Sequence, residues 1–193
     1  MNPSRIPTLL ITFRFALIPV MLLVCVIFGK TAILWLTLML LLGVASDVFD
    51  GIIARRLHCD TDKLRRLDSQ TDALFWVTVI ACTSIMDSAW LKSHGTSLIA
   101  LLGMELGCYL SSFLRFGRET CTHSYLSKAW GVSLTLAFTT LWVGFSYAEP
   151  LWHICVVLGL VSQLEVLAIL ALLPRWERDI PSALSAWRIR RPI

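Results

Sequence analysis

Six long apolar stretches dominate the chain, and they lie over residues 7–29, 31–48, 73–91, 96–114, 130–148 and 150–173. Each approaches the roughly 20 residues that a helix needs to cross the hydrocarbon core of a bilayer. Helices satisfy their own backbone hydrogen bonds in lipid, so all six stretches are expected to be helical. The composition agrees, because 56% of the residues are hydrophobic and only 16% are charged. We predict an all-α, polytopic membrane bundle of six transmembrane helices, folded as a single domain over residues 1–193.

The basic residues predict the orientation of this bundle. Only Lys30 and Lys92 fall in the loops of one face, and Arg14 lies inside the first stretch. Every other one of the 17 lysines and arginines falls on the opposite face. Because basic loops stay in the cytoplasm, both termini and the segments 49–72 and 115–129 are expected there, in a membrane of the bacterial inner-membrane type. A basic rim of this kind suits anionic lipid. It does not form the single patch that nucleic-acid binding needs.

Two pairs of aspartates flank the cytoplasmic segment between the second and third stretches. Asp47 and Asp50 are three residues apart, and Asp68 and Asp72 are four apart, so each pair lies on one face of its helix. One short connection joins the two helices, so the four carboxylates can converge. Carboxylates this close repel one another, and hard cations such as Mg²⁺ or Mn²⁺ relieve that repulsion. We predict a divalent metal site on the cytoplasmic side.

The residues around these acids fit a phosphate-containing substrate. Gly51 and Ala54 have almost no side chain, so a diphosphate can approach the helix backbone there. Arg55 offers a planar guanidinium to phosphate oxygens, and Thr61 offers a hydroxyl. Acids at the ends of membrane helices are often only solvated interface residues, and Asp60 and Asp62 are interpreted that way. Four acids in two helical pairs beside small residues and an arginine favour a functional site.

This segment resembles the signature of the CDP-alcohol phosphatidyltransferase family, D-x2-D-G-x2-A-R-x8-G-x3-D-x3-D. The matching residues are Asp47, Asp50, Gly51, Ala54, Arg55, Asp68 and Asp72. Leu64 stands where the family has its second glycine. The amino-terminal stretch with Pro7, Leu10 and Arg14 is similar to the family's P-N-x-L-T-x-x-R opening, with Thr8 and Ile11 differing from it.

The resemblance implies a role for each of these residues. Asp47, Asp50, Asp68 and Asp72 would hold two divalent metal ions, Mg²⁺ or Mn²⁺, and Asp72 would also be the general base. The donor, CDP-diacylglycerol, would be bound by Gly51, Ala54, Arg55 and Thr61. An alcohol acceptor would attack the phosphorus next to diacylglycerol and release CMP. The family also implies a homodimer as a possible assembly.

The acceptor is predicted from a second cytoplasmic cluster, which follows the fourth stretch. Its cationic candidates are Arg115, Arg118, His123 and Lys128. They suit a phosphorylated acceptor, for which glycerol 3-phosphate is the first expectation; an inositol phosphate, serine or another alcohol are alternatives. The same residues also fit plain anchoring at the membrane surface.

Two other functions remain open at this stage. An intramembrane prenyltransferase also holds a diphosphate through aspartates and Mg²⁺, although the continuation through Gly51, Ala54 and Arg55 argues against it. A membrane transporter or scaffold with a cation site would need no cytidine nucleotide.

Overall fold

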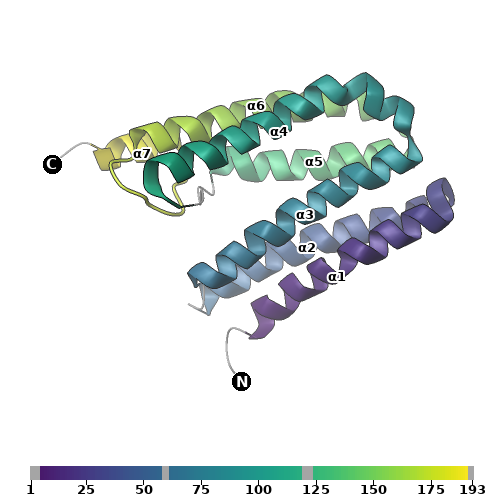
Figure 1. The fold of residues 1–193 in the computed structure, drawn as a ribbon, viewed down its shortest axis with the longest axis horizontal. Coiled ribbons are helices and arrows are strands. Elements are labelled where there is room, and N and C mark those ends of the chain that lie inside the picture. The colour runs from purple at the N-terminus through teal and green to yellow at the C-terminus, as the bar shows by residue number, and fades with distance from the viewer. Residues whose placement is uncertain (1–4, 58–60, 119–123, 191–193) are drawn as a thin grey trace. The chain divides into compact units, whose positions relative to one another are not determined.

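The structure, a computed structural model, describes residues 5–57, 61–118 and 124–190. The described helices are α1 (Arg5–Phe28), the 3-10 helix η1 (Gly29–Ala32), α2 (Ile33–Arg56), α3 (Asp62–Met86), α4 (Ser88–Phe116), α5 (Tyr125–Val143), α6 (Ala148–Leu172) and α7 (Ala183–Arg190) (Figure 1). No strand occurs in these three ranges. The prediction of an all-α protein is confirmed.

Three stretches are long and apolar enough to cross a membrane: Arg5–Arg56, Ser88–Phe116 and Ala148–Leu172. The first contains both α1 and α2, each of 24 residues. At 1.5 Å per residue such a helix is about 36 Å long, which exceeds the hydrocarbon thickness of about 30 Å. The charged first turns of α3 and the many hydroxyl side chains of α5 leave these two helices outside the three stretches. The crossing of α3 and α5 therefore stays a prediction.

Large apolar side chains face outward on these helices. Leu34 of α2 is 77% exposed, Ile99 of α4 is 73% exposed and Leu114 of α4 is 85% exposed. Apolar surface of this extent marks an interaction site or a membrane-facing surface. On helices with the length and composition of membrane spans, such a surface suits contact with lipid chains.

The ends of several helices differ from the ends of the apolar stretches. The third stretch was expected to run to residue 91, but α3 ends at Met86, and Asp87 begins a new helix by accepting a hydrogen bond from the Trp90 N–H at 3.0 Å. Hydropathy does not register such a break, because apolar residues continue on both sides. The boundary between the fifth and sixth stretches, expected near residues 148–150, lies earlier in the chain, because α5 ends at Val143 and Pro150 is already in the first turn of α6, where no N–H is needed.

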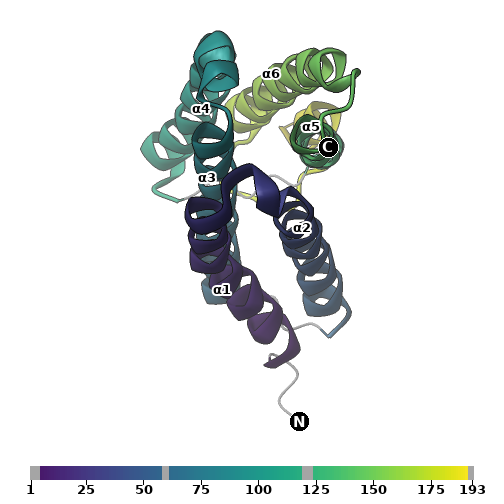
Figure 2. The same cartoon turned by 90° about the vertical axis from the view of Figure 1, so that its right-hand side faces the viewer.

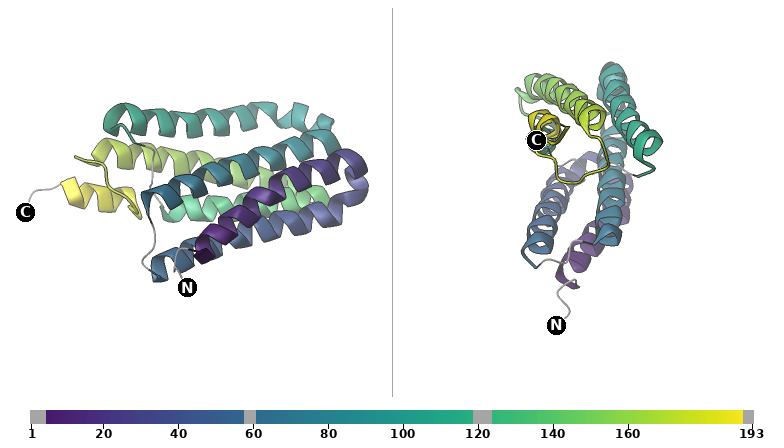
Figure 3. Two further views of the ribbon diagram at one scale, coloured as in Figure 1. Left: turned by 60° about the horizontal axis from the view of Figure 1, so that its bottom comes forward. Right: turned by 90° about the vertical axis from the view of Figure 1, so that its left-hand side faces the viewer.

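The chain divides into two compact units, and the first comprises Met1–Lys92 with Trp142–Gly144. Within it α1 packs against α2 and α3, and the three helices run side by side (Figures 2 and 3). Gly29, with φ +53°, lets the chain reverse between α1 and α2. Met21, Leu36 and Val79 are fully buried between these helices. The unit therefore fixes the ends of α2 and α3 that carry the aspartates.

The second unit comprises Ser93–Leu141 with Phe145–Ile193. Gln163 of α6 donates hydrogen bonds to Glu105, at 3.0 Å, and to the Leu101 carbonyl of α4, at 3.1 Å. A β-carbon on Gly159 would collide with Trp130 and Leu101, so this glycine permits close packing of the three helices. Polar pairing thus joins α4 to α6 within this unit. The single-domain organisation of the whole chain stays a prediction.

Candidate functional site

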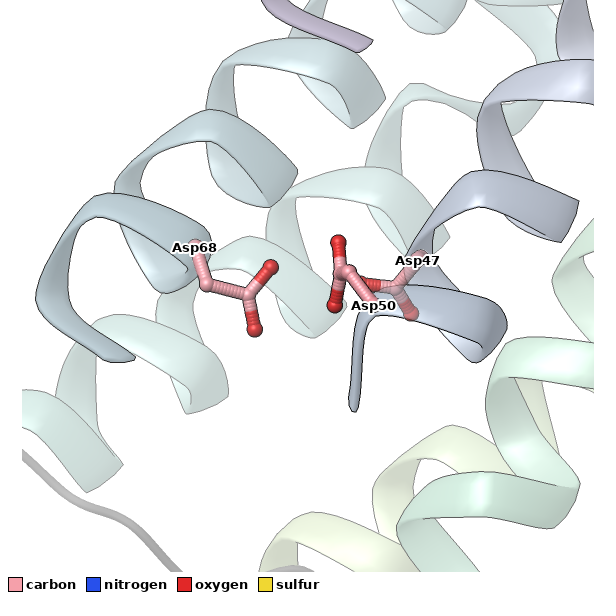
Figure 4. A group of neighbouring side chains, drawn as sticks. All are labelled: Asp47, Asp50 and Asp68. Carbon is pink, nitrogen blue, oxygen red and sulfur yellow. The ribbon is translucent and has the colours of Figure 1, made fainter. Parts of the chain in front are cut away.

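The carboxylates of three aspartates converge where α2 ends and α3 begins. Asp47 and Asp50 come from α2 and Asp68 from α3, and one oxygen of each lies within 4.8 Å of the others. Figure 4 shows the three side chains turned toward one another from the two helices. The helical spacing of each acid pair and the short connection explain this geometry, because both pairs face the partner helix. The aspartates thus form one cluster rather than separate interface residues.

Asp50 and Asp72 occupy different environments in this region. The Asp50 side chain is only 3% exposed, whereas that of Asp72 is 42% exposed. Asp72 lies outside the group of three converging carboxylates and is joined to it through a shared arginine, with 3.4 Å between Asp72 Oδ1 and Arg14 Nη1. The structure therefore places three candidate ligands together and the candidate base at their edge, where a substrate can reach it.

Arg14 of α1 is the residue of this site that the sequence reasoning missed. Its side chain is fully buried and contacts all four aspartates: Asp47, Asp50, Asp68 and Asp72. In the sequence, Arg14 lies inside the first apolar stretch and matches the family's opening motif, but no role in the site was predicted for it. The signal was present, because a charged residue inside an apolar span is a functional candidate by default. The position of Arg14 in the sequence does not reveal which face of α1 meets the acids.

The donor set fits divalent metal. All the converging atoms are carboxylate oxygens, the ligands that hard cations such as Mg²⁺ and Mn²⁺ prefer. When all are ionised, four carboxylates facing one guanidinium leave an excess of three negative charges. Like charges so close together are unfavourable unless another cation joins them. Two divalent ions would more than offset that excess.

The predicted donor-binding residues continue from this cluster. Gly51 lies under the Arg55 guanidinium, which is 3.5 Å from the position that a β-carbon would take. Ala54 is 6% exposed. Thr61 is the N-cap of α3, and its hydroxyl accepts a hydrogen bond from the Leu64 N–H at 3.3 Å. Leu64, at the position of the family's glycine, thus sits in a regular helical first turn that needs no glycine.

Three of the four predicted acceptor-binding residues lie in the described part of the second unit. Arg115 donates to the Leu173 carbonyl at 3.0 Å, and the Arg118 guanidinium stacks on the Trp176 ring at 4.9 Å. The Lys128 ammonium lies 5.8 Å from the centre of the Tyr125 ring. His123 lies outside the described residues. Each described cation has a local partner within its own unit, and a role in acceptor binding stays a prediction.

Comparison with protein families gives a match to the CDP-alcohol phosphatidyltransferase model over residues 4–173. No curated protein and no solved structure matched the chain. The family consists of transferases that act on substituted phosphate groups in phospholipid synthesis, with a CDP-alcohol donor, an alcohol acceptor and divalent metals. This match selects phosphatidyl transfer from the three functions that the sequence left open. Because it covers nearly the whole chain, including Arg14 and all four aspartates, the protein belongs to the CDP-alcohol phosphatidyltransferase family.

Proposed function

We propose that this enzyme transfers a phosphatidyl group from CDP-diacylglycerol to glycerol 3-phosphate and releases CMP, with Mg²⁺ or Mn²⁺ as cofactor. The observation that carries the proposal is the convergence of the Asp47, Asp50 and Asp68 carboxylates within 4.8 Å. A cluster of carboxylate oxygens where α2 ends and α3 begins has the chemistry to anchor a diphosphate through metal.

The four aspartates have different proposed roles. Asp47, Asp50 and Asp68 are the proposed ligands of two divalent ions, and Asp72 contributes to the same site. Bound metal would neutralise the diphosphate and the charge that develops on the departing CMP. Asp50, with a side chain only 3% exposed, is the most deeply buried of the four acids.

The donor is proposed to lie along α2 beyond the cluster. Gly51 has no side chain to obstruct the donor, Ala54 has only a methyl group and is 6% exposed, and Arg55, whose guanidinium lies beside Gly51, is placed to bind phosphate oxygens. Thr61 supplies a hydroxyl from the first turn of the next helix. These contacts hold the diphosphate at one end of the aspartate cluster and orient its phosphorus toward an incoming alcohol.

The proposed reaction is a displacement at the phosphorus that carries diacylglycerol. The acceptor oxygen forms a bond to this phosphorus, and the bond from the phosphorus to the CMP oxygen breaks. The acceptor's proton passes to a carboxylate oxygen of Asp72, whose 42% exposed side chain can reach a substrate hydroxyl. CMP leaves as the anion.

The acceptor is proposed to carry a phosphate. Arg115, Arg118, His123 and Lys128 are the cationic candidates for binding it, and cations at a membrane surface favour a phosphorylated alcohol over serine. Glycerol 3-phosphate fits best, and an inositol phosphate is the second choice. We also propose that both termini and the site face the cytoplasm of a bacterial-type inner membrane, and that the enzyme is a homodimer.

The experiment is a release assay with the full-length protein in detergent micelles. It is given CDP-diacylglycerol, Mg²⁺ or Mn²⁺, and one acceptor at a time: glycerol 3-phosphate, inositol phosphate, serine or free glycerol. Of the four acceptors, only glycerol 3-phosphate is expected to give rapid CMP release. No release is expected after a chelator removes the metal. Faster release with another alcohol would reassign the acceptor, and release that survives chelation would contradict the metal requirement.

A further inference from the structure

Arg14 occupies the centre of the aspartate cluster. Its Nη2 lies 2.9 Å from Asp50 Oδ2 and also contacts Asp68, while its Nη1 contacts Asp47 and lies 3.4 Å from Asp72 Oδ1. The two terminal nitrogens of one guanidinium thus reach all four acids. Arg14 belongs to α1, which packs on both α2 and α3, the helices that carry those acids. This arginine therefore ties the three helices together at the site.

The contacts of Arg14 are those of a counter-cation. Its side chain is fully buried, and a buried guanidinium is stable only where anions surround it. In turn, the four carboxylates would repel one another without a cation among them. The planar fork of arginine donates several N–H groups in fixed directions, so it can hold several carboxylates at once.

A divalent ion at the same place would compete with this arrangement. Its ligands would be the carboxylates that now accept from Arg14, at metal–oxygen distances of about 2.0–2.6 Å. Because three of these carboxylates lie within 4.8 Å of one another, an ion among them would lie beside the guanidinium. Like charges at that separation repel strongly in a buried site.

We propose that Arg14 is an internal counter-cation that competes with divalent metal for the aspartate cluster. It holds the four carboxylates together in the metal-free protein, and it gives up part of these contacts when metal binds. Arg14 thereby lowers the metal affinity of the cluster and stabilises the metal-free fold. The inference rests on the metal site of the proposed function, and it adds a residue of α1 that sets the affinity of that site.

The test is a titration of the full-length protein with Mn²⁺ alone, followed by calorimetry, for wild type and Arg14→Gln. We expect Arg14→Gln to bind Mn²⁺ at least about tenfold more tightly, because it removes the competing charge. Metal-free Arg14→Gln should unfold at a lower temperature than wild type, and Mn²⁺ should raise its unfolding temperature more. Arg5→Gln is the matched control, because it removes the same charge from an exposed position on the same helix. Its affinity should stay within about twofold of wild type.

Equal or weaker Mn²⁺ binding by Arg14→Gln would overturn the inference, since it would mean that Arg14 supports the metal site or is independent of it. If Arg14→Gln does not fold, Arg14→Lys decides the question. A single ammonium cannot span four carboxylates, so this variant should also bind Mn²⁺ more tightly than wild type, and unchanged binding overturns the inference. Absence of Mn²⁺ binding by wild type would instead contradict the proposed metal site itself.

Discussion

Gly43 of α2 lies directly against the ring of Phe75 of α3, with no room between them for a β-carbon. Phe75 is 1% exposed, so its ring is fixed in place. The acid pair of α2 begins one helical turn after Gly43, at Asp47, and the acid pair of α3 ends one turn before Phe75, at Asp72. This single close approach therefore sets the separation of the two acid pairs.

Replacing Gly43 with alanine should weaken both the fold and the site. The new methyl group would overlap the Phe75 ring, so α2 and α3 must move apart, at a cost of about 1–3 kcal/mol in the free energy of unfolding. The same movement separates the aspartates, so CMP release should fall as well. Thermal unfolding in detergent and the release assay measure the two effects.

A second substitution, Phe75→Leu, should relieve this overlap. Leucine lacks all three ring atoms that the methyl group added by Gly43→Ala would meet. The double variant Gly43→Ala with Phe75→Leu should therefore regain activity relative to Gly43→Ala alone. Gly103→Ala of α4 is the control, because nothing lies within 4 Å of its added β-carbon. Wild-type stability and activity in Gly43→Ala would show that this packing does not position the acids.

Asp72→Asn should remove the proposed general base without disturbing the fold. Loss of general-base assistance slows a reaction by about 10²–10⁴-fold, and we expect CMP release to fall by that factor. Asparagine keeps the shape of the side chain, so the unfolding temperature should change little.

Asp87→Asn is the matched control for this variant, because it neutralises an acid at the opposite end of α3. Asparagine can still accept the hydrogen bond from the Trp90 N–H, so stability and activity should both persist. Near wild-type CMP release from Asp72→Asn would remove Asp72 from the mechanism.

Two substitutions at Thr61 should separate its structural role from its proposed donor contact. Thr61→Val loses the N-cap of α3 and should cost about 1 kcal/mol of stability. Thr61→Asp keeps the cap but brings a negative charge toward the donor's diphosphate, so the KM for CDP-diacylglycerol should rise while stability is maintained. An unchanged KM in Thr61→Asp would leave Thr61 as a helix cap and nothing more.

Lys128→Gln should raise the KM for glycerol 3-phosphate several-fold with little change in kcat, because it removes a charge proposed to bind the acceptor's phosphate. Lys92→Gln, an equal charge change elsewhere, should leave this KM unaltered. Arg115→Gln should instead lower the unfolding temperature, because Arg115 donates to the Leu173 carbonyl at the end of α6. Equal KM values for Lys128→Gln and wild type would assign Lys128 to membrane anchoring.

The sequence predicted the helices and the acid pairs because both depend on local periodicity. Asp47 and Asp50 share a face by helical spacing alone, and so do Asp68 and Asp72. The ends of the helices were less predictable: α2 continues to Arg56, well past its apolar stretch, because helical hydrogen bonding does not stop where the charged residues begin.

Arg14 could not be assigned to the site from spacing. It is 33 residues from Asp47 and 58 from Asp72 in the chain. Only the packing of α1 against α2 and α3 determines which face of α1 meets the acids. Tertiary packing of this kind has no signature in a single helix, and neither does the contact of Gly43 with Phe75.

Diffraction from crystals grown with Mn²⁺, recorded where manganese scatters anomalously, would locate the bound metal. We expect two manganese peaks among the carboxylates of Asp47, Asp50, Asp68 and Asp72, with no such peaks in crystals of Asp50→Asn. Manganese bound elsewhere, or no manganese beside these carboxylates at saturating concentration, would contradict the proposed metal site.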